Sequence, residues 1–313
     1  MIVSAIVFFG CGDDLTKEQH LFLEQDNWGE IFENEAEFYS ASDVSPEIIN
    51  LTQKWYEIGT KAWGNYGPLE FWIVGNSVSA AKDLEKKYAV IRREKDSSVP
   101  LRAYENRTHG FEQYAKEGNA GLNLRRNEYE EWSGYIITMS AKSPSPAEED
   151  YKPVVLHEYF HVYQAAHIYS RDEEERTSRA LKNPWWTEGG AEYMAQLLYS
   201  RQEGVRPNYL KEIMSWKLSS IDNLKPGQGI QNIAYGGRET RVAYDLGAWF
   251  IAFLINKTSE EAYRIDFFKK LNEKGFEKSF EESFGAPLQS FLNEFHNVFL
   301  PSSIEDKLKI LPL

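Results

Sequence analysis

The motif HEYFH at residues 157–161 constrains this chain more than any other feature of its 313 residues. Two histidines four positions apart lie on the same face of a helix, so both imidazoles can bind one zinc ion. Glu158 lies between them, close enough to take a proton from a water molecule that the metal activates. The motif arises by chance in roughly one such sequence in a hundred, so a helix with two ordinary histidines is the alternative. The motif predicts a helix over residues 153–170 with His157 and His161 as zinc ligands and Glu158 as general base.

A second segment supplies the ligand that the motif lacks. Catalytic zinc has three protein ligands and one open position, and a new carboxylate pair follows in the run WWTEGGAEY at residues 185–193. Glu188 and Glu192 are four residues apart and share a helical face, with Thr187 as the expected N-cap. One carboxylate can bind zinc while the other hydrogen-bonds a ligand histidine, and spacing alone does not rank them. The two segments together predict a site of two histidines and one glutamate.

These segments carry a resemblance to a known group of enzymes. HEYFH followed by W-x-E-G-x-A-E-Y resembles the gluzincin (clan MA) zinc metallopeptidases. Within that group it is similar to peptidase MA-like and aminopeptidase N-like catalytic domains and to bacterial collagenases. The resemblance implies that Glu188 is the third zinc ligand and that Glu192 supports a ligand histidine. The segment 243–248 resembles the Tyr-x-x-Gly helix of the aminopeptidase N-like enzymes, which implies that Tyr244 stabilises the oxyanion.

The implied activity is hydrolysis of peptide bonds in a peptide or protein substrate, with Zn²⁺ as cofactor. The sequence departs from the aminopeptidase pattern in one respect, which puts aminopeptidase activity in doubt. Aminopeptidases of this kind hold the substrate amine with a Gly-x-Met-Glu-Asn segment, and no such segment precedes His157. The nearest candidate, residues 135–142, has no acidic side chain. One alternative is a catalytically inactive zincin-like binding protein of the cell envelope, but zinc binding alone would not require Glu158. Another is a hydrolase that acts on esters or epoxides with the same site.

The order of predicted elements gives the fold class. Strands and helices come first and helices almost alone follow, which favours an α+β, zincin-like fold. We expect an N-terminal α+β lobe over residues 21–170, with a mixed sheet and the HEYFH helix. A helical C-terminal lobe over 171–313 follows, with zinc in the cleft between the lobes. The periodic segments predict helices at 45–60, 77–95, 153–170, 188–200, 207–220, 240–256, 261–274 and 287–300, and strands at 71–74 and 135–139. Residues 97–130 show no clear pattern, and the charged run 171–176 is typical of a solvated loop.

The N-terminus predicts a location. An apolar run over residues 2–10 ends at Cys11, the one cysteine of the chain, and resembles a bacterial lipobox. Residues 1–20 are therefore expected to be a lipoprotein-type signal and tether, with a lipid on Cys11. This places the protein in the bacterial cell envelope, in the outer membrane or periplasm, with no other membrane contact. The alternative is an apolar N-terminus with an incidental cysteine.

Charge excludes one class of partner. The net charge is −13, whereas phosphate contacts need a basic surface, so nucleic acid is not an expected partner. His20, His109, His167 and His296 show no ligand spacing and are expected at the surface or in packing. The sequence leaves the oligomeric state open.

Overall fold

The computed structural model describes residues 28–96, 109–127, 132–180, 183–236 and 239–312. Cys11 and the predicted signal and tether at residues 1–20 lie outside this range. No helix within the described residues is both long and apolar enough to cross a bilayer.

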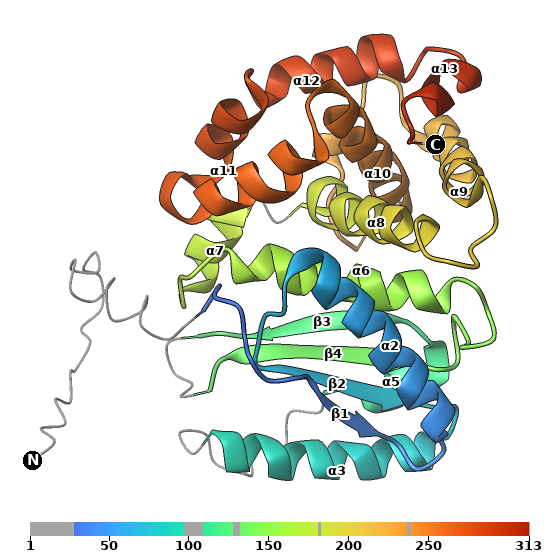
Figure 1. The fold of residues 1–313 in the computed structure, drawn as a ribbon, viewed down its shortest axis with the longest axis vertical. Coiled ribbons are helices and arrows are strands. Elements are labelled where there is room, and N and C mark those ends of the chain that lie inside the picture. The colour runs from blue at the N-terminus through green and yellow to red at the C-terminus, as the bar shows by residue number, and fades with distance from the viewer. Residues whose placement is uncertain (1–27, 97–108, 128–131, 181–182, 237–238, 313) are drawn as a thin grey trace, which may run out of the picture.

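A four-stranded mixed sheet forms the N-terminal lobe, in the order β1-β2-β4-β3 (Figure 1). Its strands are β1 (Glu37–Ser40), β2 (Leu69–Val74), β3 (Ala120–Arg125) and β4 (Gly134–Ser140). β1, β2 and β4 run parallel, and β3 pairs antiparallel with β4 at the edge. This architecture confirms the predicted α+β class and mixed sheet.

The two inner strands are the two that the sequence predicts. Every residue of β2 and β4 is buried, because helices cover both faces of the sheet, and both strands are therefore nearly continuous apolar runs. β1 and β3 are only partly buried and have fewer β-branched residues, so their sequences do not predict a strand. Residues 120–125, which had no assignment, prove to be the edge of the sheet.

Helices cover the sheet on two sides (Figure 1). α3 (Val78–Lys95) and α5 (Phe111–Glu117) lie on one face, while α6 (Tyr151–Ala166) crosses the other with α2 (Pro46–Trp63) packed against it. α6 is thus enclosed by the sheet below and by the C-terminal helices above. The predicted HEYFH helix is confirmed, although it begins two residues earlier and ends at Ala166.

The C-terminal lobe is helical, as predicted, and stacks on α6 (Figure 1). Its elements are α7 (Glu173–Ala180), α8 (Pro184–Ser200), α9 (Tyr209–Lys217), the 3₁₀ turns η1 (Leu218–Asn223) and η2 (Ile230–Asn232), α10 (Thr240–Lys257), the π-helical turn η3 (Ala262–Phe267), α11 (Phe268–Phe284), α12 (Leu288–Glu294), the π-helical turn η4 (Phe295–Phe299) and α13 (Ile304–Lys309). The Trp186 ring packs edge-on against Tyr263, Phe267 and Phe276 and anchors the start of α8 in this aromatic core.

Two local predictions in this lobe are wrong. The run 171–176 is not wholly a loop, because α7 begins at Glu173, with the Asp172 carboxylate accepting from the Glu175 backbone N–H at 2.6 Å. The N-cap of α8 is Asn183 and not Thr187: the Asn183 side chain accepts from Trp185 N at 3.4 Å, and Pro184 occupies the first helical position. Glu188 therefore lies in the second turn of α8.

Candidate metal centre

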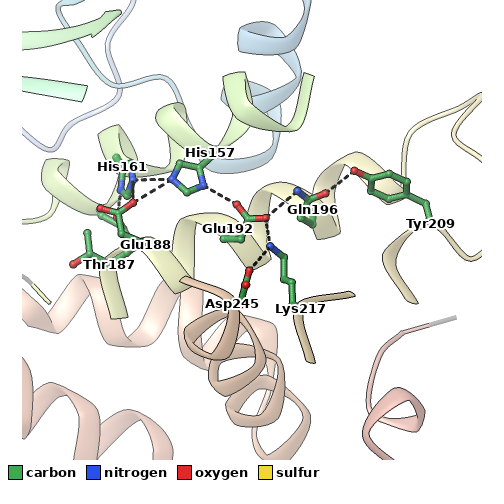
Figure 2. Close-up of polar contacts among 10 residues, drawn as sticks. His157, His161, Thr187, Glu188, Glu192, Gln196, Tyr209, Lys217 and Asp245 are labelled. Carbon is green, nitrogen blue, oxygen red and sulfur yellow. Dashed lines mark hydrogen bonds and ion pairs between the residues drawn. The ribbon is translucent and has the colours of Figure 1, made fainter. Parts of the chain in front are cut away.

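The two predicted histidine ligands project from α6 into one cavity. The apolar neighbours Leu156 and Phe160 are fully buried, whereas His157 and Glu158 keep 8% and 6% exposure. His157 Nε2 and His161 Nε2 lie 3.1 Å apart, as expected for ring nitrogens one helical turn apart that point the same way (Figure 2). The helix therefore presents two imidazole nitrogens side by side.

Glu188 brings a carboxylate oxygen to the same point. Its Oε2 lies 3.0 Å from His161 Nε2 and 3.3 Å from His157 Nε2. Within the described residues, these three side chains form the group of potential metal ligands whose donor atoms all lie within 4.8 Å of one another. A tetrahedral zinc site with bonds of about 2.0–2.1 Å separates its donors by about 3.3–3.4 Å. The observed separations of 3.0–3.3 Å fit that arrangement closely, so the donor set suits zinc in both type and spacing.

A close contact between two helices sets the position of Glu188. Gly189 of α8 faces Gly247 of α10 so closely that a Cβ atom on Gly189 would lie 2.4 Å from the Gly247 carbonyl carbon. A Cβ atom on Gly247 would lie 2.1 Å from the Trp185 carbonyl oxygen. Only glycines permit this approach of backbone to backbone. The contact brings α10, and with it Tyr244, beside the donor cluster.

Each histidine has a partner on its other ring nitrogen. His157 Nδ1 lies 3.2 Å from Glu192 Oε2, and His161 Nδ1 lies 2.7 Å from Gln164 Oε1. Gln164 is itself fixed by donating to the Thr187 carbonyl at 2.9 Å. Such partners fix the ring orientation and leave Nε2 free to act as a ligand. The position of Glu192 agrees with the supporting role that the resemblance implied, while the role of Gln164 was not predicted.

The electrostatics of the cluster favour a cation. Burial would lower the pKa of His157, but hydrogen bonds to Glu188 and Glu192 outweigh burial and raise this pKa above its ordinary value. Burial would likewise raise the pKa of Glu188, but the neighbouring His161 and His157 hold it well below its ordinary range. The raised pKa of His157 records the negative potential of the surrounding carboxylates, which is the field that a bound metal ion would meet. The lowered pKa of Glu188 records the positive charge of the protonated histidines and keeps this carboxylate ionised.

Glu158 lies beside the donors and is not one of them. Glu158 is buried, and it lines the same cavity as the two histidines and Leu122 of β3. Burial raises its pKa, and His157 and His161 oppose that rise. A carboxylate of raised pKa at this place is suited to accept and return a proton.

Two tyrosines approach from the C-terminal lobe. The Tyr244 ring stacks parallel to His157 with centroids 6.2 Å apart, and burial and Glu188 raise the pKa of its phenol. The Tyr235 hydroxyl donates to Glu188 Oε1 at 2.8 Å, on the side of the carboxylate away from the histidines. Tyr244 was expected here, whereas Tyr235 was missed because it belongs to a loop without motif or period.

The donors open into a cavity of about 1090 Å³. β3 forms one wall, α6, α7 and α8 contribute most of the others, and α5, α10 and α11 each add one or two side chains. The strand that borders the site is therefore β3, and not the segment 135–142 that the sequence suggested, since β4 lies one strand further in. His167 and His109 lie away from the cluster and are partly buried, and desolvation lowers the pKa of each to about 4.

Comparison with known proteins gives one family match. The family model of M61 glycyl aminopeptidase matches residues 151–268, from the start of α6 to the first residue of α11. The matched region contains the whole donor cluster but less than half of the chain. No curated protein and no solved structure matches. The match indicates a peptidase and agrees with the resemblance to gluzincins.

Proposed function

We propose that this protein is a zinc-dependent metallopeptidase. The observation that carries the proposal is the convergence of His157 Nε2, His161 Nε2 and Glu188 Oε2 at 3.0–3.3 Å, with the Glu158 carboxylate alongside. A zinc ion held by these three residues would act as a Lewis acid on a scissile carbonyl and would make a water molecule acidic enough to attack it. The matched peptidase family supports the same chemistry.

The side chains of this chain have distinct roles in the proposed reaction. Glu158 takes a proton from the attacking water and passes it to the leaving nitrogen. Tyr244 keeps its proton, since burial and Glu188 raise its pKa, and so can donate a hydrogen bond to the oxygen that gains charge. Glu192 and Gln164 hold the two imidazoles in their ligating orientation.

The proposal does not extend to a preference for a free amino terminus. Recognition of an α-amine needs an acidic side chain near the scissile bond, and β3, which borders the cavity, reads Ala-Gly-Leu-Asn-Leu-Arg. Asn123 and Arg125 are its polar members and neither is an acid. β3 thus supplies no such acid, although Glu173 of α7 also lines the cavity, and the glycyl aminopeptidase activity in the name of the matched family is not carried over to this chain.

Metal content and proteolysis test the proposal together. Purified protein should contain zinc near one equivalent per chain and should cleave quenched fluorescent casein until a zinc chelator is added. His161→Ala should lose most of the zinc. Glu158→Gln should keep the zinc and lose activity by about a hundredfold or more, which matches the loss of a general base. A wild type without zinc after zinc-supplemented expression rules out the metal centre.

Two outcomes favour the alternatives. Stoichiometric zinc without cleavage of any peptide substrate indicates a binding protein that has kept the fold. Turnover of ester or epoxide substrates, abolished in Glu158→Gln, indicates a different hydrolase with the same site.

A further inference from the structure

The Glu192 carboxylate is held from two sides. Its Oε2 faces His157 Nδ1 at 3.2 Å, and its Oε1 accepts from Lys217 Nζ at 2.8 Å and from Gln196 Nε2 at 3.0 Å (Figure 2). Each oxygen therefore has its own partners, which fixes the rotation of the carboxylate. Gln196 is in turn held by the Tyr209 hydroxyl at 2.7 Å.

Lys217 ends α9 and reaches in from outside the metal cluster. Its side chain is 14% exposed, and its Nζ also donates to Asp245 Oδ1 of α10 at 3.1 Å. The other Asp245 oxygen accepts from Ser220 Oγ at 2.6 Å. The ammonium group thus joins α9 to both α8 and α10, between the carboxylate of Glu192, which is 17% exposed, and that of Asp245, which is 8% exposed.

Charge explains why this lysine matters to the histidine. Burying a carboxylate without a cation is costly, and Lys217 is the lysine that pairs with Glu192. An ionised carboxylate only accepts hydrogen bonds, so facing His157 Nδ1 it requires that nitrogen to carry the proton. The Nε2 lone pair is then directed at the donor cluster. Lys217 consequently stabilises the form and orientation of His157 that bind a metal.

We propose that Lys217 is a positioning residue of the metal centre, which sets zinc affinity through Glu192 and His157 without touching the metal. The inference rests on the proposed function, because it assumes that the cluster binds zinc. It adds a residue from a third helix, to which neither HEYFH nor the Glu188–Glu192 pair points.

A double-mutant cycle separates this role from ordinary packing. Lys217→Met keeps an unbranched side chain that is one atom shorter and removes the charge, and it should weaken zinc binding by about tenfold or more, as measured by competition with a chelator. If Lys217 acts through Glu192, the same change should cost no further affinity in a Glu192→Gln background. Lys217→Arg, which keeps the charge, should restore affinity close to the wild-type value.

The control is a second buried lysine. Lys307 is 3% exposed and donates to a backbone carbonyl on the C-terminal side of the lobe, so Lys307→Met tests the general effect of removing such a group. It should lower the unfolding temperature without changing zinc affinity. If Lys217→Met does not fold, Lys217→Gln makes the same comparison, since it can still hydrogen-bond to Glu192 but has no charge.

The outcomes distinguish the two proposals. Wild-type protein that binds no zinc overturns the metal centre and the role of Lys217 with it. Wild-type protein that binds zinc, together with folded Lys217→Met of unchanged affinity, overturns the role of Lys217 alone. An equal loss of affinity in the Glu192→Gln background also overturns it, because the lysine would then act by another route.

Discussion

The substitution Gly247→Ala, which adds one methyl group, should disable the site although Gly247 is not one of its functional residues. The new Cβ atom would lie 2.1 Å from the Trp185 carbonyl oxygen, whereas Cβ atoms essentially never approach another atom within 3.0 Å. α8 and α10 must therefore separate by about 0.9 Å, the difference between these distances. Overpacking of this kind costs about 1–3 kcal/mol of stability, and here the clashing atom is backbone and cannot rotate away.

The separation acts directly on the site because each helix carries a functional group. Glu188 is on α8 and Tyr244 is on α10, so at least one of them must leave its place. A misplacement of about 1 Å can cost about a hundredfold in rate, and metal sites tolerate only about 0.2 Å. Gly247→Ala should thus lower kcat/KM for a casein peptide by about a hundredfold, and chelator competition shows which helix moved. Weakened zinc binding means that Glu188 moved, and intact zinc binding means that Tyr244 did.

A neighbouring glycine provides the control. A Cβ atom on Gly190 would lie 2.3 Å from the Tyr263 hydroxyl oxygen, which is the end of a side chain. The clash of Gly190→Ala should therefore be relieved by Tyr263→Phe, with most of the lost stability recovered in urea titrations. Wild-type activity and stability in Gly247→Ala would refute the reasoning, because α8 and α10 would then accommodate the added Cβ atom without separating.

Four further outcomes are expected. Glu188→Ala should weaken zinc binding more than Glu192→Ala, for which about 10–100-fold is typical of a lost supporting partner, and the reverse order in chelator competition would exchange their roles. Tyr244→Phe should keep zinc but lower kcat by about 10²–10³-fold, as loss of an oxyanion donor does, so an unchanged kcat excludes that role. Burial lowers the pKa of His167 from 6.5 to about 4. Its neutral form therefore stabilises the fold above pH 6.5, by at most about 3 kcal/mol, and this contribution is lost as the pH falls from 6.5 towards 4. Urea titrations should show a shallower decline for His167→Gln, and parallel curves would contradict this. Mass spectrometry of protein from bacterial membranes should find a lipid on an N-terminal Cys11, and an unprocessed N-terminus would exclude the anchor.

The helices that carry the site could be predicted because their signals are local. His157 and His161 share a face through helical spacing alone, and the same holds for Glu188 and Glu192. The strands β2 and β4 could be predicted equally well, because strands covered on both faces form nearly continuous apolar runs. What the sequence predicts well is therefore what one turn of helix or one buried strand determines.

The missed features depend on partners that are distant in the chain. β3 contains Gly121 and Asn123 and no β-branched residue, and it is extended because β4 pairs with it. Lys217 meets Glu192 only because α9 and α8 pack together, and Tyr235 reaches Glu188 from a loop. Helical periodicity identifies the face of a helix that carries a residue but contains no information about which distant segment packs there.

The open edge of β3 has a consequence for self-association. An unpaired strand edge normally invites the edge of another sheet, which leads to aggregation. Within the described residues β3 pairs with β4 alone in the sheet, and five residues of β3 line the cavity that α6, α7 and α8 also border. A strand that pairs with this edge has to enter the cavity, which suits one extended segment better than the edge of another sheet. The position of β3 beside the cavity therefore favours pairing with one extended segment over pairing between the sheets of two copies.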